Sequence, residues 1–240
     1  RLAERDKNHP CVVVWSLGNE AGPGQNFVAA EKALKARDTS RPTQYERNND
    51  IVDLGSNQYP DVGWVWRAAR GSRGIKYPFY ISEYAHIMNN ELGNLTDYWE
   101  AIESSDRILG AAIWEWCDQG LYRTNSQGVR YVAYGGDFGD APNDGQFIVK
   151  GVVFADRTPK PCYYEVKHVY QDITVKAADI ANGKVEIFNK HFFKDLSEFD
   201  VTWELSEDGR AIQSGPLTVP TVGPRQHAIV TVPFVKPDFK

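Results

Sequence analysis

The hydrophobic pattern of the chain changes near residue 170. Before that point, short apolar runs alternate with segments of helical periodicity, which is typical of a parallel sheet with crossover helices. The predicted strands cover 11–17, 43–45, 51–55, 77–81 and 110–116, and the predicted helices cover 25–37, 94–104 and 165–170. This first part is therefore expected to be an α/β domain.

After residue 170, apolar and polar positions alternate, as in antiparallel strands with one buried face. Strands are predicted at 173–177, 184–189, 199–206, 211–217 and 226–233. Asn182-Gly183 and Asp208-Gly209 are hairpin signals between them. This part is typical of an immunoglobulin-like antiparallel β-sandwich that lacks some of its roughly seven strands. The predicted domains are 1–170 and 171–240.

Segment 118–145 is rich in Gly, Asp and Asn, and it is too long for a simple connection. Loops of this length without elements of their own are either functional or disordered. Its Trp and Tyr neighbours favour a functional loop.

Composition excludes several classes of protein. The 240 residues carry a formal net charge of -5, so no basic surface is expected to neutralise nucleic acid phosphates. The three cysteines are far apart, which indicates neither a disulfide framework nor a clustered metal site. No apolar run is long enough to span a membrane, and the charged first residues are not a signal peptide. We expect a piece of a longer protein that begins within a helix.

Two glutamates follow apolar strand-like runs. Glu20 ends Trp15-Ser-Leu-Gly-Asn-Glu20, and Glu83 lies in Tyr80-Ile-Ser-Glu-Tyr-Ala-His86. Strand ends at the carboxyl rim of an αβ barrel carry its active site, and a glycosidase needs one carboxylic acid and one carboxylate. Alternatively, each glutamate is a solvated charge in a turn.

Several ordered motifs resemble the large bacterial β-galactosidases of glycoside hydrolase family 2. They are the segment from Arg5 to Glu20, Ser82-Glu-Tyr-Ala-His86, Trp114-Glu-Trp-Cys-Asp-Gln119, Tyr134-Gly-Gly-Asp-Phe-Gly-Asp140 and Gly151-Val-Val-Phe-Ala-Asp-Arg-Thr-Pro159. The resemblance implies strands four to eight of a (β/α)8 TIM barrel, followed by an incomplete sandwich. The earlier barrel strands and flanking domains would lie outside this chain.

The resemblance also implies catalytic roles. Glu20 matches the general acid/base and Glu83 the nucleophile of a retaining enzyme, whose carboxyl groups are expected about 5 Å apart. Tyr59 matches the tyrosine whose hydroxyl contacts the nucleophile, although a Tyr before Pro is otherwise more often a packing residue.

Three residues match contacts with the sugar. Asn19 matches the partner of the 2-hydroxyl, His86 a contact with hydroxyls, and Trp114 the aromatic floor. From the residues alone, Asn19 could be a turn residue, His86 structural, and Trp114 part of the core.

Lys150 departs from the β-galactosidase pattern, in which an Asn contacts the 6-hydroxyl and Na⁺. The retained match to a sodium ligand is Phe147, but a cation at Lys150 opposes sodium binding. Lys150 is expected to replace the ion's charge or to contact the substrate. The β-glucuronidases carry a similar Lys, yet Ile148 stands where their Asn grips the sugar carboxylate. Glu20 also matches one ligand of Mg²⁺, whose other ligands would lie outside this chain.

The resemblance therefore implies a retaining exo-β-glycosidase acting on terminal β-D-galactosides. The alternatives are another family 2 exo-glycosidase such as a β-glucuronidase, a non-catalytic sugar-binding module, or a fragment that is inactive in isolation. A β-galactoside is the expected partner, without nucleic acid or membrane, and a homo-oligomer of the full-length enzyme is compatible with the family. A soluble cytoplasmic or periplasmic location is expected.

Overall fold

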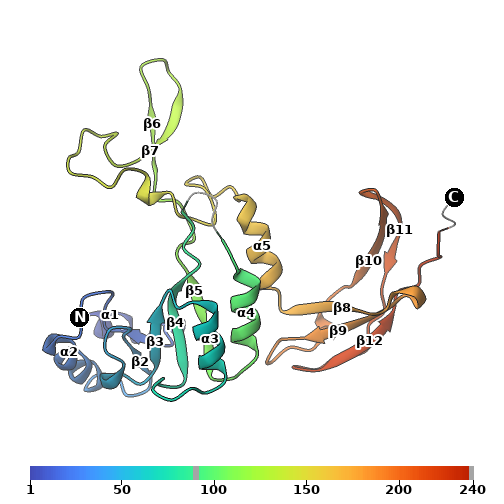
Figure 1. The fold of residues 1–240 in the computed structure, drawn as a ribbon, viewed down its shortest axis with the longest axis horizontal. Coiled ribbons are helices and arrows are strands. Elements are labelled where there is room, and N and C mark those ends of the chain that lie inside the picture. Colours follow the sequence, from blue (N-terminus) through green and yellow to red (C-terminus); the bar gives the residue numbers. More distant parts are fainter. Residues whose placement is uncertain (89–91, 238–240) are drawn as a thin grey trace. The chain divides into compact units, whose positions relative to one another are not determined.

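The structure is a computed structural model that describes residues 1–88 and 92–237 (Figure 1). The chain divides into two compact units, Arg1–Val169 and Tyr170–Lys240. Each unit is described by itself below. No helix in the described ranges is long and apolar enough to cross a lipid bilayer.

The first unit is built on five parallel strands that follow one another in chain order. They are β1 (Trp15–Ser16), β2 (Thr43–Gln44), β3 (Gly55–Gln58), β4 (Phe79–Tyr84) and β5 (Ile108–Ile113). β1 pairs with β2, a parallel bridge joins Gln44 to Leu54 just before β3, and β3, β4 and β5 pair in that order. This arrangement confirms the predicted partial barrel; the described strands do not close into a full one.

Helices precede, connect or follow these strands. They are α1 (Leu2–Asp6), α2 (Gln25–Lys35), α3 (Val62–Ala69), α4 (Leu95–Glu103) and α5 (Pro161–Val169), with short 3-10 turns η1 (Asn49–Ile51) and η2 (Gly145–Ile148). Helix α3 was not predicted, although Asp61 supplies a clear start signal: its carboxylate accepts the backbone N–H of Trp64 at 2.8 Å. Helix α5 begins at Pro161, earlier than predicted, with proline in the first turn where its missing N–H is harmless.

Four predicted strands in this unit were wrong in their bounds. Segments 77–81 and 110–116 are displaced to β4 (Phe79–Tyr84) and β5 (Ile108–Ile113). Of segment 11–17 only Trp15–Ser16 is a strand, because the backbone of Val12 is already hydrogen-bonded elsewhere. Its N–H donates to the carbonyl oxygen of His9 within a turn, and the carbonyl oxygen of Val12 accepts a hydrogen bond from the guanidinium of Arg41. In segment 51–55 only Ile51 belongs to the 3-10 turn η1, Val52 and Asp53 form a bend, and β3 begins at Gly55. A Cβ at Gly55 would collide with the carbonyl oxygen of Lys76, so this close approach requires glycine.

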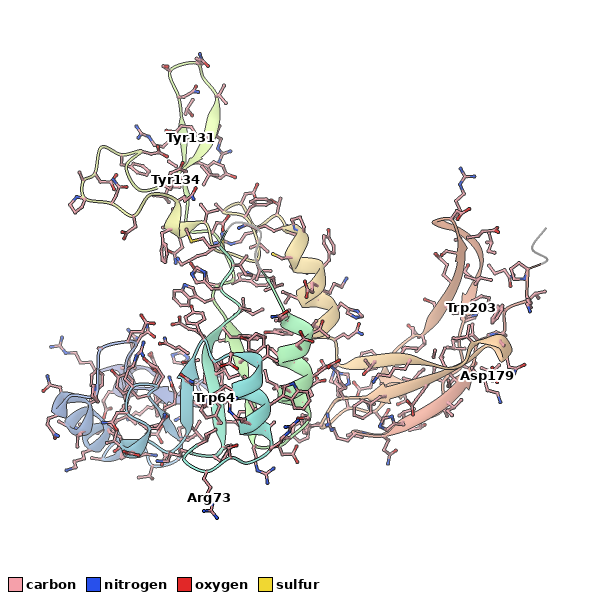
Figure 2. The ribbon with its side chains drawn as sticks, in the orientation of Figure 1. Trp64, Arg73, Tyr131, Tyr134, Asp179 and Trp203 are labelled. Carbon is pink, nitrogen blue, oxygen red and sulfur yellow. The ribbon has the colours of Figure 1, made fainter. Side chains whose placement is uncertain are left out.

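Segment 118–145 is not the irregular loop that its composition predicted. It contains an antiparallel hairpin of β6 (Leu121–Thr124) and β7 (Arg130–Ala133). The side-chain oxygen of Asn125 accepts the backbone N–H groups of Gln127 and Val129, which closes the turn. Figure 2 shows Tyr131 and Tyr134 on this segment.

The second unit consists of two antiparallel sheets, which confirms the predicted change of class. Its strands are β8 (Ile173–Asp179), β9 (Lys184–Asn189), β10 (Thr202–Glu207), β11 (Arg210–Pro216) and β12 (His227–Thr231), and its 3-10 turns are η3 (Ile180–Asn182) and η4 (Leu196–Glu198). β12, β9 and β8 form one sheet and β10 with β11 the other. Asp208 and Gly209 form the predicted two-residue hairpin turn, with φ of 47° and 76°.

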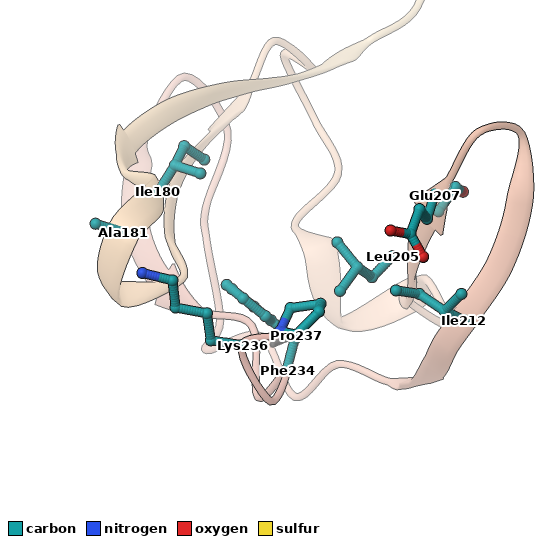
Figure 3. A pocket seen from close by; sticks show the side chains of 9 residues that line it. Ile180, Ala181, Leu205, Glu207, Ile212, Phe234, Lys236 and Pro237 are labelled. Atoms are coloured by element: carbon teal, nitrogen blue, oxygen red, sulfur yellow. The ribbon is translucent and has the colours of Figure 1, made fainter. Parts of the chain in front are cut away.

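The core of the second unit joins one sheet to the segments between strands. Ile187 of β9 and Val230 of β12 are buried with Leu196 and Val222. A separate pocket of about 290 Å³ lies beside β10, β11 and η3, lined by mostly apolar side chains such as Ile180, Leu205, Ile212 and Phe234 (Figure 3). None of the predicted site residues lies in this unit.

Candidate active site

Glu83 lies on β4 and is 8% exposed. Its Oε1 accepts a hydrogen bond from Nε2 of Gln58 at 2.9 Å, and its Oε2 accepts one from the hydroxyl of Tyr59 at 2.7 Å. Both oxygens of a largely buried carboxylate are thus held by donors from the neighbouring strand end. This fixes the rotamer of Glu83, as a nucleophile requires.

Tyr59 follows β3 directly and has a φ of 47°, a conformation that is costly for a residue with a side chain. Its backbone N–H donates to the carbonyl oxygen of Glu83 at 2.8 Å, so the two residues are linked twice. Burial, the hydrogen bond to Glu83 and the charges of Glu83, Glu20 and Glu115 all raise the pKa of the Tyr59 phenol. The hydroxyl therefore remains a donor.

Glu20 follows β1 and also has a positive φ, 50°. Its backbone N–H donates to Oε1 of Glu46 at 2.7 Å, and the Glu46 side chain is only 2% exposed. The Glu20 carboxylate itself is 49% exposed and lies 3.5 Å from a guanidinium nitrogen of Arg47. A buried anchor thus holds the backbone while the carboxylate remains accessible, as an acid/base needs.

The Gln58 side chain connects the two glutamates. Its Nε2 also donates to Oδ1 of Asn19 at 2.8 Å, and its Oε1 accepts a hydrogen bond from Arg47 at 3.0 Å. Asn19, Glu83 and the Arg47 that neighbours Glu20 therefore meet at one amide.

Aromatic rings continue the site on the other side of Tyr59. The ring of His86 lies edge-on to that of Tyr59, with 6.1 Å between centroids, and 5.8 Å from that of Phe147 in η2. Nζ of Lys150 lies 5.6 Å from the ring centroid of Trp114 and 5.8 Å from that of Phe147. These distances allow cation–π attraction.

Lys150 is buried, and its charge has a partner. Nζ lies 2.9 Å from Oε1 of Glu115, an ion pair whose angles are not those of a hydrogen bond. The other oxygen of Glu115 accepts a hydrogen bond from Nε2 of Gln119 at 2.9 Å. The cation that the sequence placed beside the sugar is thus balanced by a carboxylate of the protein.

All the predicted site residues belong to one continuous series of contacts in the first unit. It runs from Glu20 through Arg47 and Gln58 to Asn19 and Glu83, then through Tyr59, His86 and Phe147 to Lys150 and Trp114. Sequence reasoning missed two members of this series, Arg47 and Gln58, and two residues that contact it, Glu46 at Glu20 and Glu115 at Lys150. The available signal was position: Gln58 ends β3, while Glu46 and Arg47 follow β2.

The family resemblance implies two metal ions, Mg²⁺ at Glu20 and Na⁺ near Phe147. Within residues 1–88 and 92–237, no three His, Cys, Asp or Glu side chains gather into a group that could hold a metal ion. Glu20, the predicted Mg²⁺ ligand, faces Arg47 instead. Near Phe147, the carboxylate of Glu115 already pairs with the ammonium of Lys150 and is not free to balance a sodium ion, so these residues do not fit Na⁺.

Residues 1–175 match the family model described as "Glycosyl hydrolases family 2, TIM barrel domain". The chain belongs to glycoside hydrolase family 2. Residues 185–240 of this family 2 chain match the model described as "Beta-galactosidase, domain 4".

Curated relatives agree with this assignment. The family 2 chain is 41% identical over 217 residues to a beta-galactosidase of Priestia megaterium, covering 88% of this chain and 21% of that protein. It is 36% identical to beta-galactosidase 2 of Enterobacter cloacae (91% and 22% covered) and 39% identical to the beta-galactosidase of Leuconostoc mesenteroides (89% and 22%). The chain thus spans about a fifth of the length of these relatives.

Proposed function

We propose that this chain supplies the catalytic carboxylates of a retaining exo-β-glycosidase that hydrolyses terminal β-D-galactosides. Family membership and relatives named as beta-galactosidases support the class of reaction. The observation that carries the proposal is Glu83, a buried carboxylate whose two oxygens accept hydrogen bonds from Gln58 and Tyr59. The same Gln58 accepts a hydrogen bond from Arg47, which lies beside the accessible second glutamate, Glu20.

In the first step, an oxygen of Glu83 attacks the anomeric carbon and forms an ester bond to the sugar. The bond from that carbon to the glycosidic oxygen breaks, and Glu20 gives its proton to the departing oxygen. The aglycone leaves as an alcohol, and the sugar remains covalently attached to Glu83.

In the second step, Glu20 accepts a proton from water, whose oxygen attacks the anomeric carbon. The ester bond breaks and Glu83 recovers its negative charge, which the Tyr59 hydroxyl and the Gln58 amide stabilise as hydrogen-bond donors. Two displacements at one carbon retain the β configuration. The separation of about 5 Å between the two carboxyl groups stays a prediction.

The remaining residues are proposed to hold the sugar. Asn19 lies beside the nucleophile through Gln58 and would contact the 2-hydroxyl, His86 lies against Tyr59 and would contact other hydroxyls, and Trp114 would form the floor. Because the charge of Lys150 is balanced by Glu115, we infer a neutral sugar rather than a uronic acid in this position.

Labelling with a 2-deoxy-2-fluoro-β-galactosyl fluoride tests the proposal, since such sugars form the ester and hydrolyse it slowly. The natural protein that contains this chain is treated with the reagent, digested and sequenced by mass spectrometry. We expect one adduct, on Glu83. No adduct, or an adduct elsewhere, would contradict the assignment. The same assay on residues 1–240 alone shows whether the isolated chain is active, and light scattering gives the oligomeric state.

A further inference from the structure

The orientation of the Gln58 amide is set by its three partners. Its two N–H groups face acceptors, Oε1 of Glu83 at 2.9 Å and Oδ1 of Asn19 at 2.8 Å, and its oxygen faces the guanidinium of Arg47 at 3.0 Å. Reversing the amide would place its oxygen against two acceptors and its N–H groups against a cation. Only the observed orientation satisfies every group.

This orientation also determines how Asn19 can bind a ligand. Its Oδ1 accepts from Gln58, so the two N–H groups of the Asn19 side chain are left to meet a sugar hydroxyl. Asn19 is exposed, whereas Gln58 is half-buried. The exposed amide is thus oriented by the less accessible one.

Strand pairing places Gln58 beside the nucleophile. Gln58 of β3 is in register with Glu83 of the parallel strand β4, and the register shifts between Asn57 and Gln58. Residues opposite one another on paired strands can interact directly across the sheet. The contact therefore follows from the β3–β4 pairing.

We propose that Gln58 is a positioning residue that couples Asn19 to the nucleophile, with Arg47 as its anchor. The proposal rests on the function proposed above. Gln58 holds Oε1 of Glu83 and turns the Asn19 N–H groups toward the 2-hydroxyl of the sugar. Loss of Gln58 thus costs more with a substrate that carries this hydroxyl than with one that lacks it.

The test compares an aryl β-galactoside with its 2-deoxy analogue in the natural protein that contains this chain. Gln58→Met keeps the length of the side chain and removes its donors, and Gln58→Glu keeps a polar group without the amide N–H. Gln127→Met, in the exposed hairpin turn, is the matched control. Thermal unfolding midpoints show whether each variant is folded.

Gln58→Met is expected to lower kcat/KM for the galactoside by about tenfold to a hundredfold, the range for a hydrogen bond to a charged group. The advantage of the galactoside over its 2-deoxy analogue should shrink about fivefold, the range for a neutral hydrogen bond. Gln58→Glu should lose the same selectivity and should also lose kcat/KM on both substrates, because its carboxylate lies against that of Glu83. Gln127→Met should show neither loss.

An equal loss on both substrates, or no loss, in a folded variant would overturn the proposal. Failure of both variants to fold would assign Gln58 a structural role and overturn it as well. The fluorosugar adduct distinguishes failure of the proposed function from failure of the proposed role of Gln58. If the unsubstituted protein forms no adduct on Glu83, the proposed function fails. If the adduct forms and the selectivity of the variants is unchanged, only the role of Gln58 fails.

Discussion

Tyr59 and Glu83 are joined by two hydrogen bonds: the phenol hydroxyl donates to Oε2 of the carboxylate at 2.7 Å, and the backbone N–H of Tyr59 donates to the Glu83 carbonyl oxygen at 2.8 Å. The backbone bond explains how a residue with φ of 47° is held in place. The backbone bond thus keeps the Tyr59 main chain beside Glu83, within reach of the carboxylate.

Replacing Tyr59 by Phe removes the hydroxyl and keeps the ring. We expect kcat to fall about tenfold to a hundredfold, because the Glu83 carboxylate loses a donor that stabilises it as the ester breaks. The glycosyl-enzyme should accumulate, which rapid-quench mass spectrometry detects. Tyr134→Phe, on an exposed tyrosine, is the control. A lower kcat without accumulation would show that Tyr59 does not assist the second step.

The pKa of Tyr59 predicts the alkaline side of the activity profile. A phenol is neutral when protonated, and its pKa is raised here from the ordinary value near 10, so Tyr59 keeps its proton throughout the neutral and mildly alkaline range. The alkaline limb of kcat/KM below about pH 10 should therefore fall at the same pH in the wild-type protein and in Tyr59→Phe. A shift of this limb in the variant would mean that Tyr59 titrates there.

Replacing Glu20 by Gln removes the proposed acid/base. Substrates with poor leaving groups should lose about 10²- to 10⁴-fold in kcat/KM, since they need a proton on the departing oxygen. Activated dinitrophenyl glycosides should lose far less in this step, and azide should restore turnover by replacing water as the nucleophile. Glu83→Gln provides the contrast, because every leaving group should suffer equally. Equal losses for all leaving groups in Glu20→Gln would contradict the assignment.

The buried ion pair of Lys150 and Glu115 predicts a stability effect. Lys150→Met leaves the Glu115 carboxylate, 18% exposed, without its cation, and should lower the free energy of unfolding by about 3 kcal/mol. Adding Glu115→Gln should recover part of the loss. Lys7→Met breaks the exposed pair with Glu4 and should cost about 1 kcal/mol or less. Urea unfolding measures all three, and equal losses in the two single variants would show that Lys150 is not a buried charge pair.

Two isoleucines of one sheet offer a matched test of the core in the second unit. Ile187 on β9 is 3% exposed, whereas Ile229 on the adjacent β12 is 63% exposed. Ile187→Ala should lower the free energy of unfolding by about 2–5 kcal/mol, and Ile229→Ala by about 0.5 kcal/mol. Similar values for the two variants would place the core on the wrong face of the sheet.

Local patterns were sufficient where the chain's own alternation decides the structure. The bounds of β9 were predicted as observed, and the Asp208-Gly209 turn forms because both positions adopt positive φ. The order of strands and helices in the first unit follows from the same kind of pattern. The ends of the strands do not follow from such a pattern. Strand β3, for example, begins at Gly55 because its partner β4 determines the register.

The sequence by itself predicted the class of both units and singled out Glu20 and Glu83 as the candidate catalytic pair, because a motif retains its residue types at fixed spacing wherever the strands lie. The tertiary structure alone decided which side chains surround these glutamates. Gln58 bonds to Asn19 and Glu83, and Lys150 pairs with Glu115, across separations of 39, 25 and 35 positions. Such contacts depend on strand pairing and side-chain rotamers, which short-range periodicity does not encode.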